Sequence, residues 1–140
     1  MSVQLEIDGL DGLDRAFAAL SDDIKAAVHT AVVGTAVELQ GVVQRSIQDG
    51  PASGVTYELT NPNRTHTASA AGEAPATDTG RLVGSIEFDI DGPMTAIVSA
   101  NTIYAARLEF AMDRPYFRPA IEKITPKFNA RLERAIKGVI

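Results

Sequence analysis

The residues best suited to chemistry are Asp78-Thr79-Gly80, because Asp-Thr-Gly is the triplet that carries the catalytic carboxylate of aspartic proteases. That chemistry needs two carboxylates that share one proton, so this chain would work only as a homodimer through Asp78. A protease triplet follows an apolar strand, whereas residues 72–77 are Gly-Glu-Ala-Pro-Ala-Thr and the large, charged Arg81 follows. We therefore expect Asp78 to cap a helix or form a turn, with the protease kept as an alternative.

Other chemistry is weakly supported by the sequence. Glu87, Asp89 and Asp91 alternate along a predicted strand and could bind a divalent cation, but a solvated outer face is the favoured interpretation. His29 and His66 have no second His, nor a Ser and Asp, at a recognisable spacing. The chain has no Cys, which excludes disulfides and thiolate metal sites. We expect no catalytic residue, no cofactor, no metal site and no enzymatic activity.

Length and composition predict one ordinary domain over residues 1–140, with 45% hydrophobic and 22% charged residues. No segment approaches the roughly 18 apolar residues that a membrane span needs, and residues 1–8 lack a signal pattern. We therefore expect neither a membrane segment nor a cleaved signal. The net charge of −5 argues against a uniformly basic nucleic-acid surface.

Charge is unevenly distributed along the chain. Residues 104–140 carry eight of the 13 Lys and Arg residues but four of the 18 Asp and Glu residues. Such polarity could attract copies to one another head to tail, although two solvated faces would give the same pattern. A second alternative function is a nucleic-acid-associated module that uses the basic C-terminal helix.

The N-terminal half predicts a strand followed by helix. Alternating apolar residues indicate a strand over residues 3–7, and apolar spacings of three and four indicate helix from residue 10 to about Gly50. Ser21 is expected to cap a new helix within this stretch, giving a short helix and then a long one. Gly34 and Gly41 share one face of the long helix, which predicts close approach by another backbone.

Residues 50–79 are dominated by Gly, Pro, Ala, Ser, Thr and Asn, and only residues 55–59 look like a strand. The sequence predicts a long extended loop. So long a connection within one domain is usually functional or disordered, so we expect it to contact another subunit or a partner.

The C-terminal half predicts a hairpin and two helices. Strands are expected over residues 86–90 and 94–100, then a short helix over residues 104–110. Pro119 should open the last helix, with a kink or break at Pro126. The fold class is α+β, a small antiparallel sheet packed by a long N-terminal helix and a C-terminal helix, with a long extended loop.

Three segments in fixed order and spacing resemble a known family. They are Glu73-Ala74-Pro75-x2-Asp78-Thr79-Gly80-Arg81-Leu82-x2-Ser85-Ile86, Tyr104-Ala105-x2-Leu108-Glu109-Phe110 and Arg114-Pro115-x2-Arg118-Pro119-Ala120. The set is similar to the small head-tail joining proteins of long-tailed bacteriophages of the lambdoid type, also described as neck, tail-completion or minor tail components. The family has Gly after Glu-Phe where this chain has Ala111-Met112, which puts in question a positive-φ turn at that point.

The resemblance implies a structural virion protein that catalyses nothing. It implies a homo-oligomeric ring around the DNA path at the joint between capsid and tail, assembled in the bacterial host cytoplasm. The implied partners are further copies of the chain and other neck, connector or tail-tube proteins. DNA would pass through the lumen without specific binding, and no membrane would be involved.

Structural roles are expected for the motif residues. Arg81 and Glu109 are expected to form an ion pair, and Tyr104 and Phe110 to anchor the core. The contact residues and the remaining motif positions are Arg114, Arg118, Pro75, Thr79, Gly80, Leu82, Ser85, Pro115 and Pro119.

Overall fold

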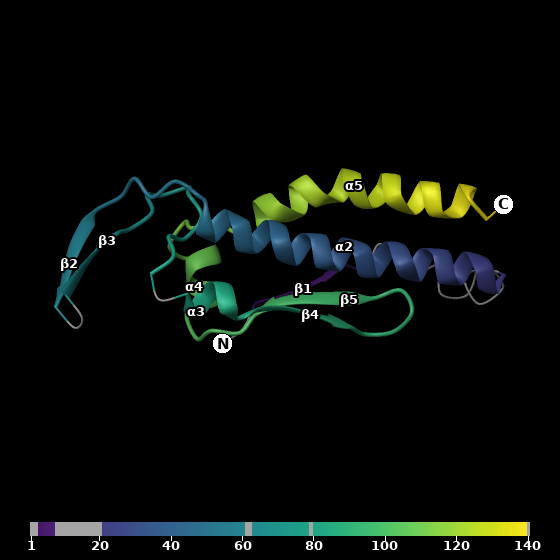
Figure 1. Cartoon of the computed structure of the whole chain (residues 1–140), viewed down its shortest axis with the longest axis horizontal. Helices are drawn as coiled ribbons and strands as arrows, with labels where there is room; N and C mark the ends of the chain where they lie inside the picture. Colours follow the sequence, from purple (N-terminus) through teal and green to yellow (C-terminus); the bar gives the residue numbers. More distant parts are fainter. Residues whose placement is uncertain (1–2, 8–20, 61–62, 79, 140) are drawn as a thin grey trace.

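A computed structural model describes residues 3–7, 21–60, 63–78 and 80–139 and has the predicted α+β fold (Figure 1). The elements in chain order are β1 (Val3–Ile7), α2 (Asp22–Gln48), β2 (Thr56–Thr60), β3 (Asn63–Thr67), α3 (Arg81–Gly84), β4 (Ile86–Ile90), β5 (Ala96–Ala100), α4 (Ala105–Phe110) and α5 (Arg118–Lys137). The predicted short helix after residue 10 lies outside the described residues.

Helix α2 begins and ends where the sequence predicts. The Ser21 hydroxyl accepts a hydrogen bond from the Ile24 N–H at 3.3 Å, which satisfies one of the free donors at the helix start. Asp22 and Asp23 place negative charge against the positive end of the helix dipole. The helix ends at the cap residue Asp49, just before Gly50-Pro51.

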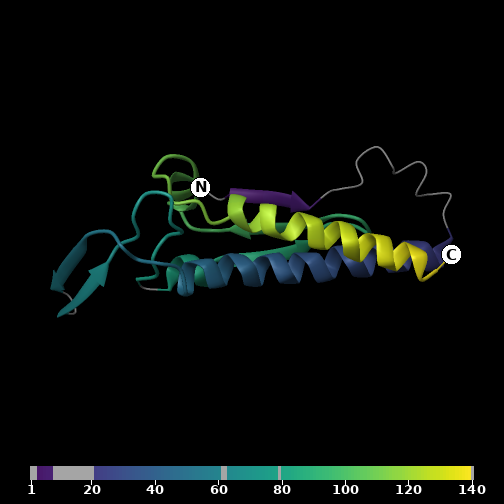
Figure 2. The ribbon, with the colours of Figure 1, turned by 90° about the horizontal axis from the view of Figure 1, so that it is seen from above.

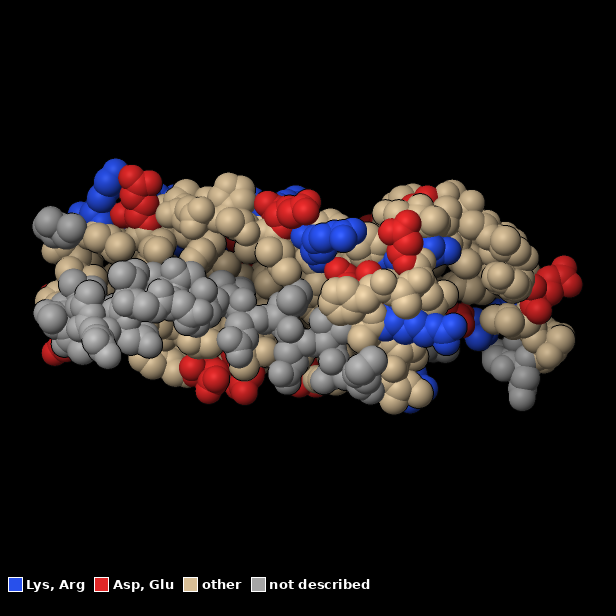
Figure 3. Space-filling view, turned by 180° about the vertical axis from the view of Figure 1, so that it is seen from behind, with Lys and Arg blue, Asp and Glu red and all other residues tan. Residues whose placement is uncertain are grey.

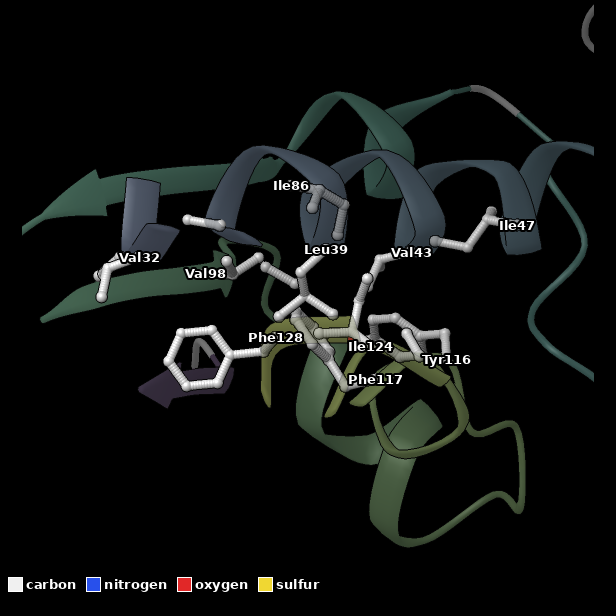
Figure 4. Packing of buried hydrophobic residues seen from close by; sticks show 14 of the residues in the cluster. Val32, Leu39, Val43, Ile47, Ile86, Val98, Tyr116, Phe117, Ile124 and Phe128 are labelled. Atoms are coloured by element: carbon white, nitrogen blue, oxygen red, sulfur yellow. The ribbon is translucent and has the colours of Figure 1, made fainter. Parts of the chain in front are cut away.

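Helices α2 and α5 lie side by side, and α2 also packs against β4 and β5 of a three-stranded antiparallel sheet (Figures 1 and 2). The strand order is β1-β5-β4, with Val98 opposite Leu5 on one side and Phe88 on the other. The buried side chains of α2, β5 and α5 meet in a single core (Figure 4). Its largest fully buried members are Tyr116, Phe117, Leu39, Ile47, Val32, Val43 and Val98.

The expectation that no segment approaches a membrane span is wrong by length and composition, because α2 is long and apolar enough to cross a membrane. However, 44% of its apolar window is buried inside the structure, where it packs against the sheet and α5. That burial accounts for the apolar character of the helix.

The expected break at Pro126 is wrong, whereas a kink there stays a prediction. The expected close approach of another backbone is not found at Gly34 or at Gly41 within the described part of the chain. Helix α5 continues through Pro126 without a break; Pro126 is exposed, while Ile124 and Phe128 on either side are buried and hold the helix against the core. At Gly34 the nearest atoms to an added Cβ belong to the Arg131 side chain, at 3.8 to 3.9 Å, rather than to another backbone. The space beside Gly34 therefore accommodates an arginine from α5.

The segment over residues 50–79 is more ordered than predicted. Strand β2 matches the strand-like stretch within one residue, and β3 pairs with it as an antiparallel hairpin that projects from the body (Figures 1 and 2). The sequence over residues 63–67 is Asn-Arg-Thr-His-Thr, which has no apolar alternation to indicate a strand. Backbone pairing with β2 holds β3 extended.

Candidate functional site

The three motif segments come together in one groove at the base of the β2–β3 hairpin. The groove has a volume of about 520 Å³. Tyr57 and His66 line it from the hairpin, and Tyr104 and Leu108 line it from the body. The motif residues along its wall are Pro75, Asp78, Gly80, Arg81, Leu82, Tyr104 and Arg114. Each of the three segments thus contributes at least one side chain to this groove.

Asp78 binds the hairpin and does not cap α3, so the expected cap is wrong, while the bend at Asp78 agrees with the turn that was its alternative. Its carboxylate forms a two-pronged ion pair with Arg64 of β3, and His66 Nδ1 lies 3.8 Å from Asp78 Oδ1. Helix α3 is capped by Gly80 at a φ of 79°, without a side-chain hydrogen bond. The left-handed turn at Gly80 starts the helix, which leaves Asp78 free to reach Arg64. Thr79 lies outside the described residues.

Glu109 caps α5 instead of pairing with Arg81, so that ion-pair expectation is also wrong. One Glu109 oxygen accepts the N–H groups of Tyr116 and Phe117 at 2.7 and 3.1 Å, and the other accepts that of Arg118 at 2.9 Å. The cap residue Phe117 has no polar side chain to do this. A carboxylate at this position satisfies free donors and complements the helix dipole.

Tyr116 joins the same two helices from inside the core, a role that sequence reasoning missed. Its hydroxyl donates to the Ala105 carbonyl at 2.8 Å, and its ring lies 5.0 Å from that of Phe117. Burial, with Glu109 and Tyr104 nearby, raises the pKa of Tyr116 far above its ordinary value of 10.0. It therefore stays a neutral donor. The only sequence signal was its place between the two Arg-Pro pairs.

Glu73 clamps the base of the hairpin. Its carboxylate accepts the backbone N–H and the hydroxyl of Ser53 and the N–H of Ala70 at 2.8 Å. The neighbouring Gly72 N–H donates to the Asp113 carbonyl at 2.8 Å, which ties the loop to the body. These hydrogen bonds, that of the Ser53 hydroxyl first, lower the pKa of Glu73 below its ordinary value of 4.5. Sequence reasoning quoted Glu73 as a motif residue but gave it no role.

Of the two aromatic residues that were expected to anchor the core, only Tyr104 does so. Tyr104 is partly buried and packs against the core, but Phe110 is 74% exposed, so its expected core role is wrong. Phe110 is the last residue of the short helix α4. Its exposure is similar to that of Ile103, whose side chain is 81% exposed. The turn after it is made by Asp113 at a φ of 51°, two residues beyond the position where the family has Gly.

The remaining motif positions have local structural contacts. Arg114 donates to the carbonyls of Met112 and Asp113 at 2.8 and 3.3 Å, and Arg118 is exposed. Ser85 Oγ donates to the Leu82 carbonyl at 2.8 Å. The buried motif residues are Pro75, Leu82 and Pro115, and Pro119 is exposed in the first turn of α5.

The structure gives no support for a metal site at the three acidic residues or for catalysis by His29. Glu87, Asp89 and Asp91 are exposed, and the described part of the chain holds no cluster of three metal-ligand side chains. His29 Nδ1 donates to the Pro93 carbonyl at 2.9 Å and so links α2 to the turn between β4 and β5.

No protein-family model, curated protein or solved structure matches this chain. The interpretation of the groove therefore depends on its own residues and on the three sequence segments.

Replacing Glu109 by Ala should lower the free energy of unfolding by about 1–3 kcal/mol, because three N–H groups lose their acceptor. The matched change Glu133→Ala removes only an exposed pair with Lys137 and should cost about 0.5 kcal/mol or less. Urea denaturation of both variants measures the difference. Equal losses would contradict the capping role.

The Glu73 clamp should weaken in acid. Because its folded pKa is lowered, the clamp is fully present above pH 4.5 and is lost as the pH falls through the lower folded value. We expect the hydrogen-exchange protection factor of the Ala70 amide to drop between about pH 6 and pH 3, while α2 core amides stay protected. Glu73→Gln should lower this protection at pH 6 and remove its dependence on pH, because the amide cannot ionise. A wild-type Ala70 amide that is equally protected throughout would rule the clamp out.

Proposed function

We propose that this chain is a structural, non-enzymatic virion protein of the phage head-tail joint, acting in neck formation or tail completion. In this proposal it forms a homo-oligomeric ring around the DNA path. The supporting observation is that residues of all three segments that resemble the family line a groove beside a projecting hairpin, the third segment through Arg114 alone. Pro115, Pro119 and Ala120 of the third segment line a second pocket, together with Glu73 and Ala74 of the first. A shared structural purpose explains why these separated segments keep a fixed order and spacing.

The hairpin is suited to contact with a neighbour. Val55 and Tyr57 are 61% and 51% exposed on it, and large exposed apolar side chains are typical of contact surfaces. A two-stranded hairpin is marginally stable in isolation. The hydrogen bonds of Glu73 and the ion pair of Arg64 hold this hairpin, residues 55–67, in a defined position, and we call it the arm. We assign the arm and groove to contact with another copy or with a neck, connector or tail-tube protein.

The net charge of −5 is compatible with a ring through which DNA slides, because acidic surfaces do not hold phosphates. The alternative of a nucleic-acid module on α5 is weakened by internal pairing: Lys127 and Arg131 both bind Glu38, and Lys137 binds Glu133. That alternative requires DNA binding that falls steeply with salt.

The aspartic-protease alternative is also weakened. Its carboxylate must share a proton with a second carboxylate. The Asp78 carboxylate instead pairs with the Arg64 guanidinium, and its side chain is 34% exposed. A structural role for Asp78 in holding the hairpin accounts for these contacts without catalysis.

Deleting residues 55–67 should leave the protein folded but prevent heads from joining tails. Gly54 N–H donates to the Ala68 carbonyl at 2.8 Å, so the two cut ends lie side by side and a short glycine link can close them. The expected result, in the phage that encodes the chain, is an accumulation of separate heads and tails seen by electron microscopy, with a loss of infectious titre.

A finer variant separates arm contacts from folding. Val55→Ser with Tyr57→Ser should lower the yield of joined particles, whereas Val37→Ser, at an α2 side chain that is 48% exposed, should leave the yield unchanged. Complete infectious virions from the deletion would reject the proposed role of the arm.

A further inference from the structure

We propose that the C-terminal helix of one copy binds the outer face of the sheet of a second copy through two complementary rows of charge. The basic row consists of Lys123, Lys127, Arg131 and Arg134 on α5, and the acidic row consists of Glu87, Asp89 and Asp91 at β4 and the turn after it. This contact rests on the proposed function for its biological setting. It adds to that function by naming which surfaces of neighbouring copies meet.

The basic row lies along one side of α5. Its residues are spaced by four, four and three positions, which places them on adjoining turns over about 16 Å of helix. Glu38 of α2 is bound at 3.0 Å by Lys127 and at 2.6 Å by Arg131. Lys123 and Arg134 have no carboxylate partner among the described residues. One carboxylate for four cations leaves three positive charges in excess.

The acidic row lies on the edge strand of the sheet. Glu87, Asp89 and Asp91 are exposed and alternate with Phe88 and Ile90, and none forms an ion pair with a described residue. At the rise of an extended strand the row spans about 13 Å. Its three negative charges and its length match the excess charge and the length of the basic row.

The two rows cannot meet within one chain, because Glu87 and Asp89 alternate with Phe88, which lies opposite the buried Val98, and so they lie on the face of the sheet away from the helices. Figure 3 shows acidic side chains along the border on the side of the sheet, away from α5. A contact between the rows of two copies is head to tail, and it leaves one row free at each end. Contacts of this type continue into a closed ring or an open filament.

A second copy fits the basic row better than nucleic acid does. The net charge of −5 repels a phosphate backbone at long range, and the acidic row would remain without cations if DNA covered α5. Pairing the rows supplies opposite charge to both at once. Such contacts are exposed, so their strength falls as salt screens them.

Charge reversal with mixing tests this contact in purified protein. An acid-reversed variant carries Glu87→Lys, Asp89→Lys and Asp91→Lys, and a base-reversed variant carries Lys123→Glu, Lys127→Glu and Arg134→Glu. Arg131 is left in place because it packs beside Gly34 and binds Thr35. A control with the same charge change as the acid-reversed variant, away from both rows and from the arm, carries Asp22→Lys, Asp23→Lys and Asp49→Lys. Circular dichroism checks that each variant folds.

Sedimentation velocity at low salt should show self-association of the wild type and of the control that weakens at about 0.5 M NaCl. Each reversed variant alone should associate at least tenfold more weakly, and a mixture of the two should recover association, because opposite rows again face each other. A monomeric wild type, or a mixture that stays monomeric, would overturn the contact. Salt-dependent DNA binding that only base reversal abolishes would also overturn it. The head-tail role is tested separately, by particle assembly.

Discussion

The carboxylate of Glu109 is the interaction on which the arrangement of this molecule most depends. It accepts the three N–H groups that begin α5, from a position on α4 that no local sequence pattern assigns to capping. Because α4 follows directly from β5, this contact fixes the start of α5 relative to the sheet. The helix then runs along α2, where Ile124 and Phe128 reach the core and Arg131 reaches Glu38.

The same junction supports the groove. The turn between α4 and α5 passes through Asp113, whose carbonyl accepts the Gly72 N–H from the base of the hairpin. Glu73 then binds Ser53 and Ala70, on the two sides of the hairpin base. Asp78 binds Arg64, which lies further along the hairpin on β3. An arm that is held in place before it meets a partner loses less conformational freedom on binding. This is a physical reason for polar anchors at motif positions.

Elements with a clear period could be predicted from the sequence. The strand over residues 3–7, the Ser21 cap with the long helix behind it, and the hairpin of β4 and β5 are confirmed, since each follows from local apolar spacing. The polar strand β3 could not be predicted in this way, because its pairing with β2 and the Arg64–Asp78 ion pair are tertiary contacts that no local apolar spacing indicates.

The site was harder to predict than the fold. The motif residues were found, but their partners were not: Asp78 reaches back 14 residues to Arg64, and Glu109 reaches forward across a turn to backbone groups. Phe110 was assigned to the core from its apolar side chain, yet it ends a short helix at the surface. Side-chain type gives a residue's capacity for contact, and tertiary structure decides which contact is made.

The most direct measurement of the central claim is imaging of phage particles whose genome encodes this chain, with antibody-linked gold and cryo-electron microscopy. The account predicts label only at the joint between head and tail, and there a closed ring of copies around the DNA path. Label elsewhere on the particle, or particles that lack the chain, would contradict it.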